Sequence, residues 1–251
     1  AFHQDPRYTP ALEQEELVAA GYLGRKSGRG WYDHGEEAAR RAPATEPDRR
    51  PPAHVSVGAT AGYLTPLIER LRGAGVDVRM PGPDDAIRLP DGGELRLTDG
   101  RTATAVAVEV GGPVVLLDLS LDPATATRFA VSASDGCPDP VLHAAVGLLQ
   151  QTGAAVSVLD DVPGLVVART VAMLVNEAAD VVGTGVTTPQ QVDLAMLHGV
   201  NYPMGPLEWG ERWGARPVVQ LLDHLADTYR DGHYRAAPSL RRRSLAHGEG
   251  S

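Results

Sequence analysis

The pattern of hydrophobic and polar positions divides the chain into three zones and a linker. The first zone begins with apolar residues at helical spacing and ends in the glycine-rich cluster Gly21–Tyr32. A segment rich in Glu, Arg, Ala and Pro follows without hydrophobic periodicity, which is typical of a linker. Short β-type runs fill the next zone, and helical periodicity fills the last. The resulting boundaries are residues 1–34, a linker over 35–52, residues 53–162 and residues 163–251.

The zone over residues 53–162 predicts an α/β domain. Two strand-like runs, residues 54–58 and 76–80, flank a helix over 63–72 whose leucines and isoleucine share one face. The turn Asp91-Gly92-Gly93 predicts a β-hairpin. Strand, helix, strand with short connections favours a parallel, right-handed unit. The other expected elements are a helix over residues 140–152 and strands over residues 103–110, 114–119 and 154–159.

The last zone predicts a helical domain. Residues 165–182 are apolar almost all round, which indicates a central, buried helix. Thr188-Pro189-Gln190-Gln191 has the form of a capping box, with a proline at the first helical position. Two more helices are expected, one opening at Gly205-Pro206 and an amphipathic one over residues 217–229.

A sequence repeat links the two ends of the chain. Asp5-x-x-Tyr8 near the start is echoed by Asp231-x-x-Tyr234 near the end. Each pair is followed by a proline, a leucine and a short helical stretch that ends at glycine. We therefore expect the chain to open on the tail of one helical copy and to close on the tail of a second.

Composition and charge narrow the classes of partner. The 251 residues carry a formal net charge of −9, which disfavours nucleic acid because phosphate backbones are bound by basic surfaces. No apolar run approaches the roughly 20 residues that span a bilayer. A single cysteine, Cys137, cannot form an intrachain disulfide. We expect a cytoplasmic protein with no metal site and no nucleic-acid or membrane partner.

The segment Gly58–Gly62 is the candidate nucleotide site. A nicotinamide-binding βαβ unit places glycines in a tight turn, so that backbone N–H groups and a helix N-terminus approach the pyrophosphate. Here only two glycines occur, spaced G-x-x-x-G, and Asp77 does not lie at the end of the second strand, where the ribose-binding acid belongs. A βαβ unit without cofactor is the expectation, and nucleotide binding at this segment stays open as the alternative.

Three motifs in a fixed order carry a family resemblance. Residues 200–209, VNYPMGPLEW, are similar to a G-x-x-Y-P-x-G-P-x-E segment; residues 163–169, PGLVVAR, resemble P-G-F-V-x-N-R; and residues 24–32, GRKSGRGWY, resemble G-R-K-S-G-x-G-F/Y-Y. These motifs belong to the C-terminal domain of 3-hydroxyacyl-CoA dehydrogenases. The chain resembles the C-terminal half of the long bacterial type, which serves 3-hydroxybutyryl-CoA or phenylacetate catabolism.

The resemblance implies an α/β plus all-α fold: a reduced Rossmann-like βαβ domain followed by a helical 3-hydroxyacyl-CoA dehydrogenase C-terminal domain. Residues 1–34 would be the tail of a first domain of the same helical type. It also implies that the full-length enzyme uses NAD to oxidise L-3-hydroxyacyl-CoA to 3-oxoacyl-CoA, in fatty acid or phenylacetate catabolism. A homodimer that forms through the helical domains is expected as well.

Departures from the family pattern concern catalysis. In the family, a His–Glu pair in the complete NAD domain removes the hydroxyl proton, and no matching segment is found here. We expect His143 to be a surface residue of a helix. The family's substrate-polarising Asn corresponds to Ala168, whose methyl group cannot form a hydrogen bond. The expectation is a chain with no catalytic residue and no bound cofactor, which supplies the structural and dimerisation half. The alternative is a non-catalytic dimerisation or acyl-CoA-binding scaffold from a split or decayed gene.

Other side chains have candidate roles in binding, hydrogen bonding or packing and not in catalysis. Arg25 and Lys26 lie in a glycine-flanked loop and are the candidate substrate-binding residues, through the phosphates of CoA; a solvated basic loop is the alternative. Asn176 and Glu177 are expected to form interhelical or capping hydrogen bonds, because buried polar groups need partners. Glu208 is expected to bind the amides at the start of its helix. Three aromatic residues are expected to pack in the core: Tyr202, Trp209 and Trp213.

Overall fold

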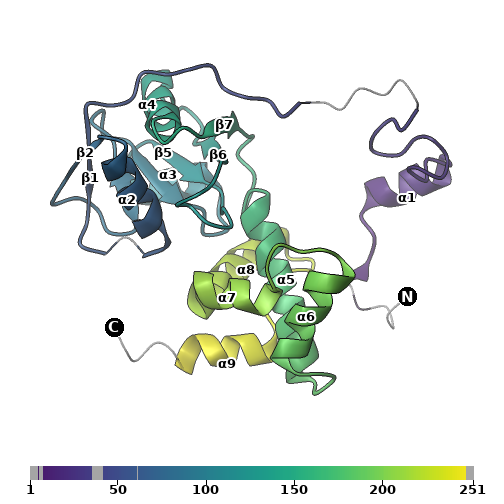
Figure 1. Ribbon diagram of the computed structural model, residues 1–251. Coiled ribbons are helices and arrows are strands. Elements are labelled where there is room, and N and C mark those ends of the chain that lie inside the picture. Colours follow the sequence, from purple (N-terminus) through teal and green to yellow (C-terminus); the bar gives the residue numbers. More distant parts are fainter. Residues whose placement is uncertain (1–4, 6–7, 36–41, 61, 247–251) are drawn as a thin grey trace. The chain divides into compact units, whose positions relative to one another are not determined.

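The computed structural model describes residues 5, 8–35, 42–60 and 62–246. They form two compact units (Figure 1). The smaller unit comprises residues up to 43 together with 231–233, and the larger comprises residues 44–230 together with those from 234 onward.

The smaller unit has one helix and a glycine-rich turn. Helix α1 (Leu12–Ala19) starts where the Gln14 side chain accepts a hydrogen bond from Ala11 N–H at 2.9 Å, and none of its residues is buried. In the turn that follows, Gly24 N–H donates to the Arg29 carbonyl at 2.8 Å. The helix predicted for this zone is therefore confirmed.

The larger unit contains a seven-stranded mixed sheet in the order β2-β1-β3-β4-β5-β6-β7. Its strands are β1 (His54–Val57), β2 (Asp77–Arg79), β3 (Ala86–Arg88), β4 (Glu94–Leu97), β5 (Val114–Leu117), β6 (Arg128–Ala133) and β7 (Ala155–Val158). The same domain contains a short 3-10 helix, η2 (Gly62–Leu64), and the helices α2 (Thr65–Gly73), α3 (Ala103–Val110) and α4 (Asp139–Gln150). Large apolar side chains of strands and helices, such as Leu67, Ile87 and Phe129, form the core of this domain.

Strand pairing confirms the predicted parallel βαβ unit, but other strand pairs of the sheet are antiparallel. Strands β1 and β2 are parallel, with Val55 opposite Val78, and α2 connects them. The hairpin predicted at the Asp-Gly-Gly turn is β3–β4, which pairs Ile87 with Leu95 in antiparallel register. The pairs β1–β3 and β5–β6 are also antiparallel, whereas β4–β5 and β6–β7 are parallel.

The strand predicted over residues 103–110 is wrong, because this segment is helix α3. Its alternation of alanine or threonine with valine imitates a strand, but both ends carry strong helix signals. The Thr102 hydroxyl accepts from Ala105 N–H at 3.1 Å, and the Asp161 carboxylate accepts from the amides of Ala103 and Thr104. Gly111, at φ 76°, ends the helix in the left-handed conformation. Strand β6 was not predicted at all, because Arg128 and Ser132 weaken its apolar pattern.

A strap formed by residues 44–50 lies along β7 and α4. Glu46 N–H donates to the Val156 carbonyl of β7 at 2.8 Å, and Arg49 N–H donates to the Gln150 side chain of α4 at 2.8 Å. A Cβ at Gly147 would lie 2.5 Å from the Arg50 carbonyl oxygen, so glycine lets the strap approach α4 closely. This half of the predicted linker is thus in contact with the sheet domain, whereas residues 36–41 lie outside the described residues.

The helical domain is built around α5 (Val167–Gly183), which contacts each of the other four helices, as predicted for a central helix. Those helices are α6 (Pro189–Gly199), α7 (Pro206–Trp213), α8 (Ala215–Tyr229) and α9 (Pro238–Ala246). The predicted capping box of α6 is present, with Thr188 and Gln191 bonding reciprocally. Across the described part of the chain, no helix is both long and apolar enough to cross a membrane.

Buried Asn176 holds α9 against α5, and this confirms its predicted interhelical role. Its amide nitrogen donates to the Arg235 carbonyl at 3.0 Å, and its oxygen accepts from Ala237 N–H at 2.7 Å. The Ser239 hydroxyl adds a bond to the Ala179 carbonyl at 2.7 Å. The segment before α9 is therefore fixed by polar contacts as well as by packing.

Candidate functional site

The main candidate site is a cavity of about 880 Å³ in the larger unit. It lies at the start of α2, beside β4 and the loop that follows it, and is lined on the helical domain by residues of α7 and α8. Its volume is within the range of small-molecule sites, roughly 300–1,000 Å³. Its lining mixes both signs of charge with aromatic groups: Tyr63, Asp85, Arg96, Asp99, Arg101, Glu109, Asp122, Arg212 and Trp213.

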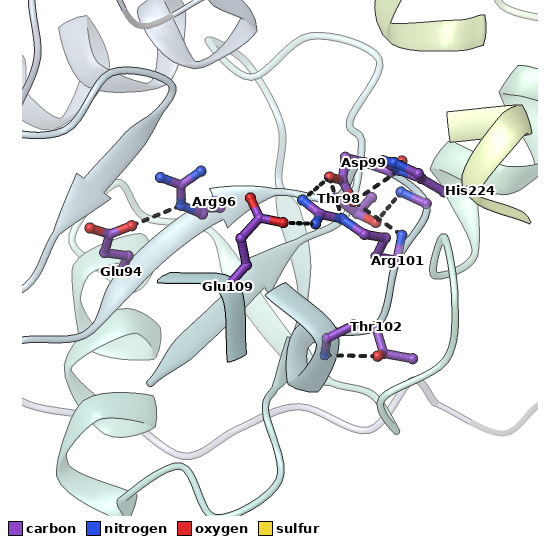
Figure 2. Close-up of polar contacts among 10 residues, drawn as sticks. Glu94, Arg96, Thr98, Asp99, Arg101, Thr102, Glu109 and His224 are labelled. Carbon is purple, nitrogen blue, oxygen red and sulfur yellow. Dashed lines mark hydrogen bonds and ion pairs between the residues drawn. The ribbon is translucent and has the colours of Figure 1, made fainter. Parts of the chain in front are cut away.

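Arg101 is the centre of a charged network on one wall of this cavity (Figure 2). Its guanidinium donates to the Asp99 carboxylate at 2.6 and 2.9 Å and also bonds to Glu109. The hydrogen bond to Asp99 raises the pKa of Arg101, which therefore remains a cation. Because both acids are paired with this one guanidinium, the network is a fixed part of the wall.

His224 of α8 connects the helical domain to the same network. Its Nδ1 lies 2.8 Å from the Asp99 carbonyl oxygen and 3.6 Å from the Asp99 carboxylate (Figure 2). A carbonyl oxygen only accepts, so Nδ1 is the donor of this hydrogen bond. Gly100, at φ 102°, makes this approach feasible, because a Cβ there would lie 2.5 Å from the Leu221 carbonyl of α8. The loop after β4 therefore joins the sheet to the helical wall of the cavity.

Two other ionisable groups beside the cavity are held in one protonation state. Glu94 is buried between Arg88 at 2.7 Å and Arg96 at 2.8 Å. Burial alone would raise its pKa, but the hydrogen bonds from the two arginines outweigh this and hold the pKa below its usual value. Burial, followed by the charge of Asp122, raises the pKa of Tyr63, whose hydroxyl donates to the Ser120 carbonyl at 2.8 Å. Tyr63 is therefore a neutral donor and not a base.

The glycine loop after β1 is occupied by an acid of the chain itself. Asp84 accepts a hydrogen bond from Thr60 N–H at 3.0 Å. Asp77, the other acid considered for this site, lies at the start of β2 and pairs with Arg79 at 2.7 Å. A pyrophosphate would have to displace the Asp84 carboxylate, so the loop in this conformation does not fit a dinucleotide. Ala61 of the predicted motif lies outside the described residues.

Ala168, which the motif resemblance predicts to lie at the family's Asn position, is fully buried in the first turn of α5. The Asp118 carboxylate, immediately after β5, accepts from the amides of Val166, Val167 and Ala168 at 3.1, 2.8 and 2.9 Å. A carboxylate at a helix N-terminus satisfies free N–H groups and interacts favourably with the helix dipole. The start of α5 is therefore closed by an internal acid that binds its amides.

Arg25 and Lys26, the predicted substrate-binding residues, lie together in the glycine-rich turn of the smaller unit, and both are exposed. Lys26 lines a separate shallow cavity with apolar neighbours that include Leu17 and Trp31. Neither residue lines the 880 Å³ cavity, whose residues all belong to the larger unit. Their role in binding stays a prediction.

The role predicted for Glu208 is wrong. The amides of Leu207 and Glu208, at the start of α7, donate to the carboxylate of Asp193 on α6 at 2.8 and 3.1 Å. Glu208 instead pairs with Arg212 one turn later, at 2.8 Å. Asp193 reaches α7 because Gly205 has no side chain, since a Cβ there would lie 2.2 Å from its carboxyl carbon.

The aromatic and nucleophilic side chains considered for the site lie mostly in the core or in helices. Trp209 and Trp213 are buried in the core of the helical domain, as predicted, and Trp213 also lines the large cavity. His143 lies in α4 and is half-buried. Burial raises the pKa of the Cys137 thiol, which makes it a poor nucleophile. Within the described ranges, no group of three His, Cys, Asp or Glu side chains is placed to hold a metal ion.

The acids that the sequence did not reveal share one property: each contacts backbone amides far away in the chain. Asp118 binds amides about 50 residues later, and Asp84 binds one 24 residues earlier. A local signal existed only for Asp118, which directly follows an apolar strand, where polar side chains often face a site.

Comparison with known proteins agrees with this architecture. Residues 95–163 match the 3-hydroxybutyryl-CoA dehydrogenase reduced Rossmann-fold domain, and residues 164–249 match the 3-hydroxyacyl-CoA dehydrogenase C-terminal domain. The chain is 35% identical over 245 residues to 3-hydroxyadipyl-CoA dehydrogenase of Escherichia coli (strain K12), a match that covers 98% of this chain and 46% of that protein. The 3-hydroxybutyryl-CoA dehydrogenase of Clostridioides difficile is 37% identical over 78 residues, which are 31% of this chain and 28% of that protein.

Solved structures give the same result. The crystal structure of 3-hydroxybutyryl-CoA dehydrogenase from Escherichia coli K12 superposes with a TM-score of 0.80 at 34% identity, over 98% of this chain and 46% of that one. The chain thus spans about half the length of its Escherichia coli relatives. Both the motif resemblance and the expected fold class are confirmed. With a reduced Rossmann-fold domain followed by a C-terminal helical domain, the chain belongs to the 3-hydroxyacyl-CoA dehydrogenase family.

Proposed function

We propose that this chain is the structural half of an NAD-dependent 3-hydroxyacyl-CoA dehydrogenase that oxidises L-3-hydroxyacyl-CoA to 3-oxoacyl-CoA in the cytoplasm. Hydride transfer to NAD takes place on a complete nucleotide-binding domain that these residues do not include. The half described here encloses part of the acyl-CoA groove and forms the homodimer through its helical domain.

The observation that carries this proposal is the closed start of α5. Ala168 offers a methyl group where the family polarises its substrate, and Asp118 binds the three surrounding amides. An acyl-CoA oxygen at this point would meet a carboxylate and find no free donor among these amides. The second helical domain therefore supports the fold without taking part in the reaction.

A direct test is an assay of the purified chain with acetoacetyl-CoA and NADH, followed by the absorbance of NADH. We expect no turnover above buffer, whereas the Escherichia coli 3-hydroxyadipyl-CoA dehydrogenase serves as positive control under the same conditions. Steady turnover by the chain alone would contradict the proposal, because it would require a catalytic base and a cofactor site within these residues.

The second candidate function is a non-catalytic scaffold that binds acyl-CoA, and the exposed Arg25 and Lys26 favour it. In this reading the two side chains contact the phosphates of CoA. Calorimetric titration with CoA would then show weaker binding for Arg25→Ala and Lys26→Ala than for the native chain. Arg216→Ala, which removes an exposed charge from α8, is the matched control. Equal binding by all four proteins would remove Arg25 and Lys26 from the substrate site.

A further inference from the structure

The 880 Å³ cavity lies at the carboxyl ends of three strands that run in one direction. Strand β3 is antiparallel to both β1 and β4, and β5 is parallel to β4, so β1, β4 and β5 share a direction. Tyr63 follows β1, Thr98 follows β4 and Leu121 follows β5, and all three residues line the cavity. In open α/β sheets, ligands bind in the crevice outside the carboxyl ends of the strands.

The two helices that follow β1 and β4 cover opposite faces of the sheet. Leu67 of α2 packs in the same core as Leu117 of β5. Val106 of α3 packs in a separate cluster with Leu116 of β5. Because successive residues of a strand point to opposite faces, the connections after β1 and β4 diverge at this point. Such a divergence leaves a crevice between the loops, and the cavity lies there.

Arg96 of β4 brings a cation with free donors to the wall of this cavity. Its Nε donates to the Glu94 carboxylate at 2.8 Å, and Figure 2 shows the two terminal nitrogens of the guanidinium on the side away from Glu94. Among the described residues, none accepts a hydrogen bond from these two nitrogens. Glu94 is 3% exposed and also pairs with Arg88, so one buried carboxylate serves two arginines. This group therefore carries one positive charge in excess.

The rest of the lining favours a ligand with a single negative charge and an apolar body. The donors of Arg101 are already taken by Asp99 and Glu109. Asp85 and Asp122 add two more acids, which oppose a dianion such as phosphate. The planar fork of a guanidinium matches the two oxygens of one carboxylate. The apolar part of the lining includes Leu97, Val106, Leu116, Leu121 and Trp213.

We propose that this cavity binds a monocarboxylate with an apolar body, such as a medium-chain carboxylic acid, and that Arg96 binds the carboxylate through its two terminal nitrogens. Glu94 lies outside the lining and is a positioning residue, since it holds the guanidinium in this orientation. The inference goes beyond the proposed function and does not rest on it, because the site requires neither CoA nor a nicotinamide.

The test is a calorimetric titration of the full chain with sodium octanoate, below the concentration at which octanoate forms micelles. We expect saturable binding by the native chain. Arg96→Gln should weaken binding about tenfold or more, because a charge-assisted hydrogen bond is lost. Arg96→Lys keeps the charge but not the fork, so it should show a smaller loss, and it carries the test if Arg96→Gln does not fold.

Arg88→Gln is the matched control, because it removes the other arginine from Glu94 and Arg88 does not line the cavity. It should bind octanoate as the native chain does. Octan-1-ol, which lacks the charge, should not distinguish the native chain from Arg96→Gln, and inorganic phosphate should not compete with octanoate.

Three results would overturn the inference: no saturable binding by the native chain, equal octanoate affinities of the native chain and the Arg96 variants, or an equal loss in Arg88→Gln and Arg96→Gln. The titration contains neither CoA nor NADH, so its outcome is independent of whether the chain turns over acetoacetyl-CoA.

Discussion

Asp118 should be among the most sensitive single positions in the larger unit. Its carboxylate is 2% exposed and accepts four hydrogen bonds, from Leu119 N–H and from the three amides at the start of α5. The substitution Asp118→Asn keeps the shape of the side chain. It replaces one acceptor oxygen by an NH2 group, which points a donor at two of the four N–H groups.

The expected cost follows from the number of donors left without an acceptor. A buried donor that loses its partner costs about 1–3 kcal/mol, and loss of a helix N-cap costs about 0.5–2 kcal/mol. Two affected donors therefore give a loss of about 3 kcal/mol in the free energy of unfolding. For a unit of this size, 1 kcal/mol lowers the melting temperature by about 2–4 °C, so Asp118→Asn should melt about 6–12 °C lower.

The assay is thermal unfolding followed by circular dichroism and by tryptophan fluorescence, since Trp209 and Trp213 report on the helical domain. Asp227→Asn, an exposed substitution on α8, is the control and should change stability by less than about 0.5 kcal/mol. If the two variants melt together, the carboxylate does not hold α5, and the account of the closed site at Ala168 fails.

Three more predictions concern buried positions. Asn176→Leu leaves the Arg235 carbonyl and the Ala237 amide without their partner and should cost about 2–4 kcal/mol, seen as an earlier midpoint in urea; an unchanged midpoint would contradict its role in holding α9. Glu94→Gln should cost about 1–3 kcal/mol at neutral pH. Because the pKa of Glu94 in the fold lies below its ordinary value of 4.5, its stabilisation is complete above that pH and is lost as the pH falls through the lower folded value. The difference between native and variant midpoints should therefore shrink in acid, and a constant difference would refute the ion-pair account. Ala168→Asn introduces the residue of the family motif into a fully buried site and should lower the free energy of unfolding by about 2–4 kcal/mol. It should not create dehydrogenase activity. A gain of turnover in the acetoacetyl-CoA assay would contradict the proposal that this domain takes no part in the reaction.

The elements that the sequence predicted correctly are those with local signals. The Thr188 capping box, the hairpin at the Asp-Gly-Gly turn and the apolar face of α8 each depend on residues within a few positions of one another. The prediction for residues 103–110 was wrong because its local signal misled. Its alternating pattern is a strand signal, and one of the contacts that make it helical comes from Asp161, far along the chain.

The candidate site was predictable only in part. Its motifs revealed the family, and the incomplete glycine pattern at Gly58–Gly62 predicts a βαβ unit without cofactor, which stays a prediction. What occupies the loop was hidden, because Asp84 reaches it through the fold, and so was the closure of α5 by Asp118. The charged cavity wall formed by Arg101, Asp99 and His224 brings two domains together, so no single stretch of sequence could reveal it.

The strap of residues 44–50 has a consequence for how the sheet domain can be handled in isolation. Strand β7 ends the sheet on one side, and an uncovered edge strand offers free N–H and C=O groups to any other chain. By bonding to the Val156 carbonyl, the strap blocks that edge against intermolecular strand addition. A fragment that begins at residue 53 would leave the edge of β7 uncovered and should aggregate more readily. A fragment that begins at residue 44 retains the strap that covers this edge.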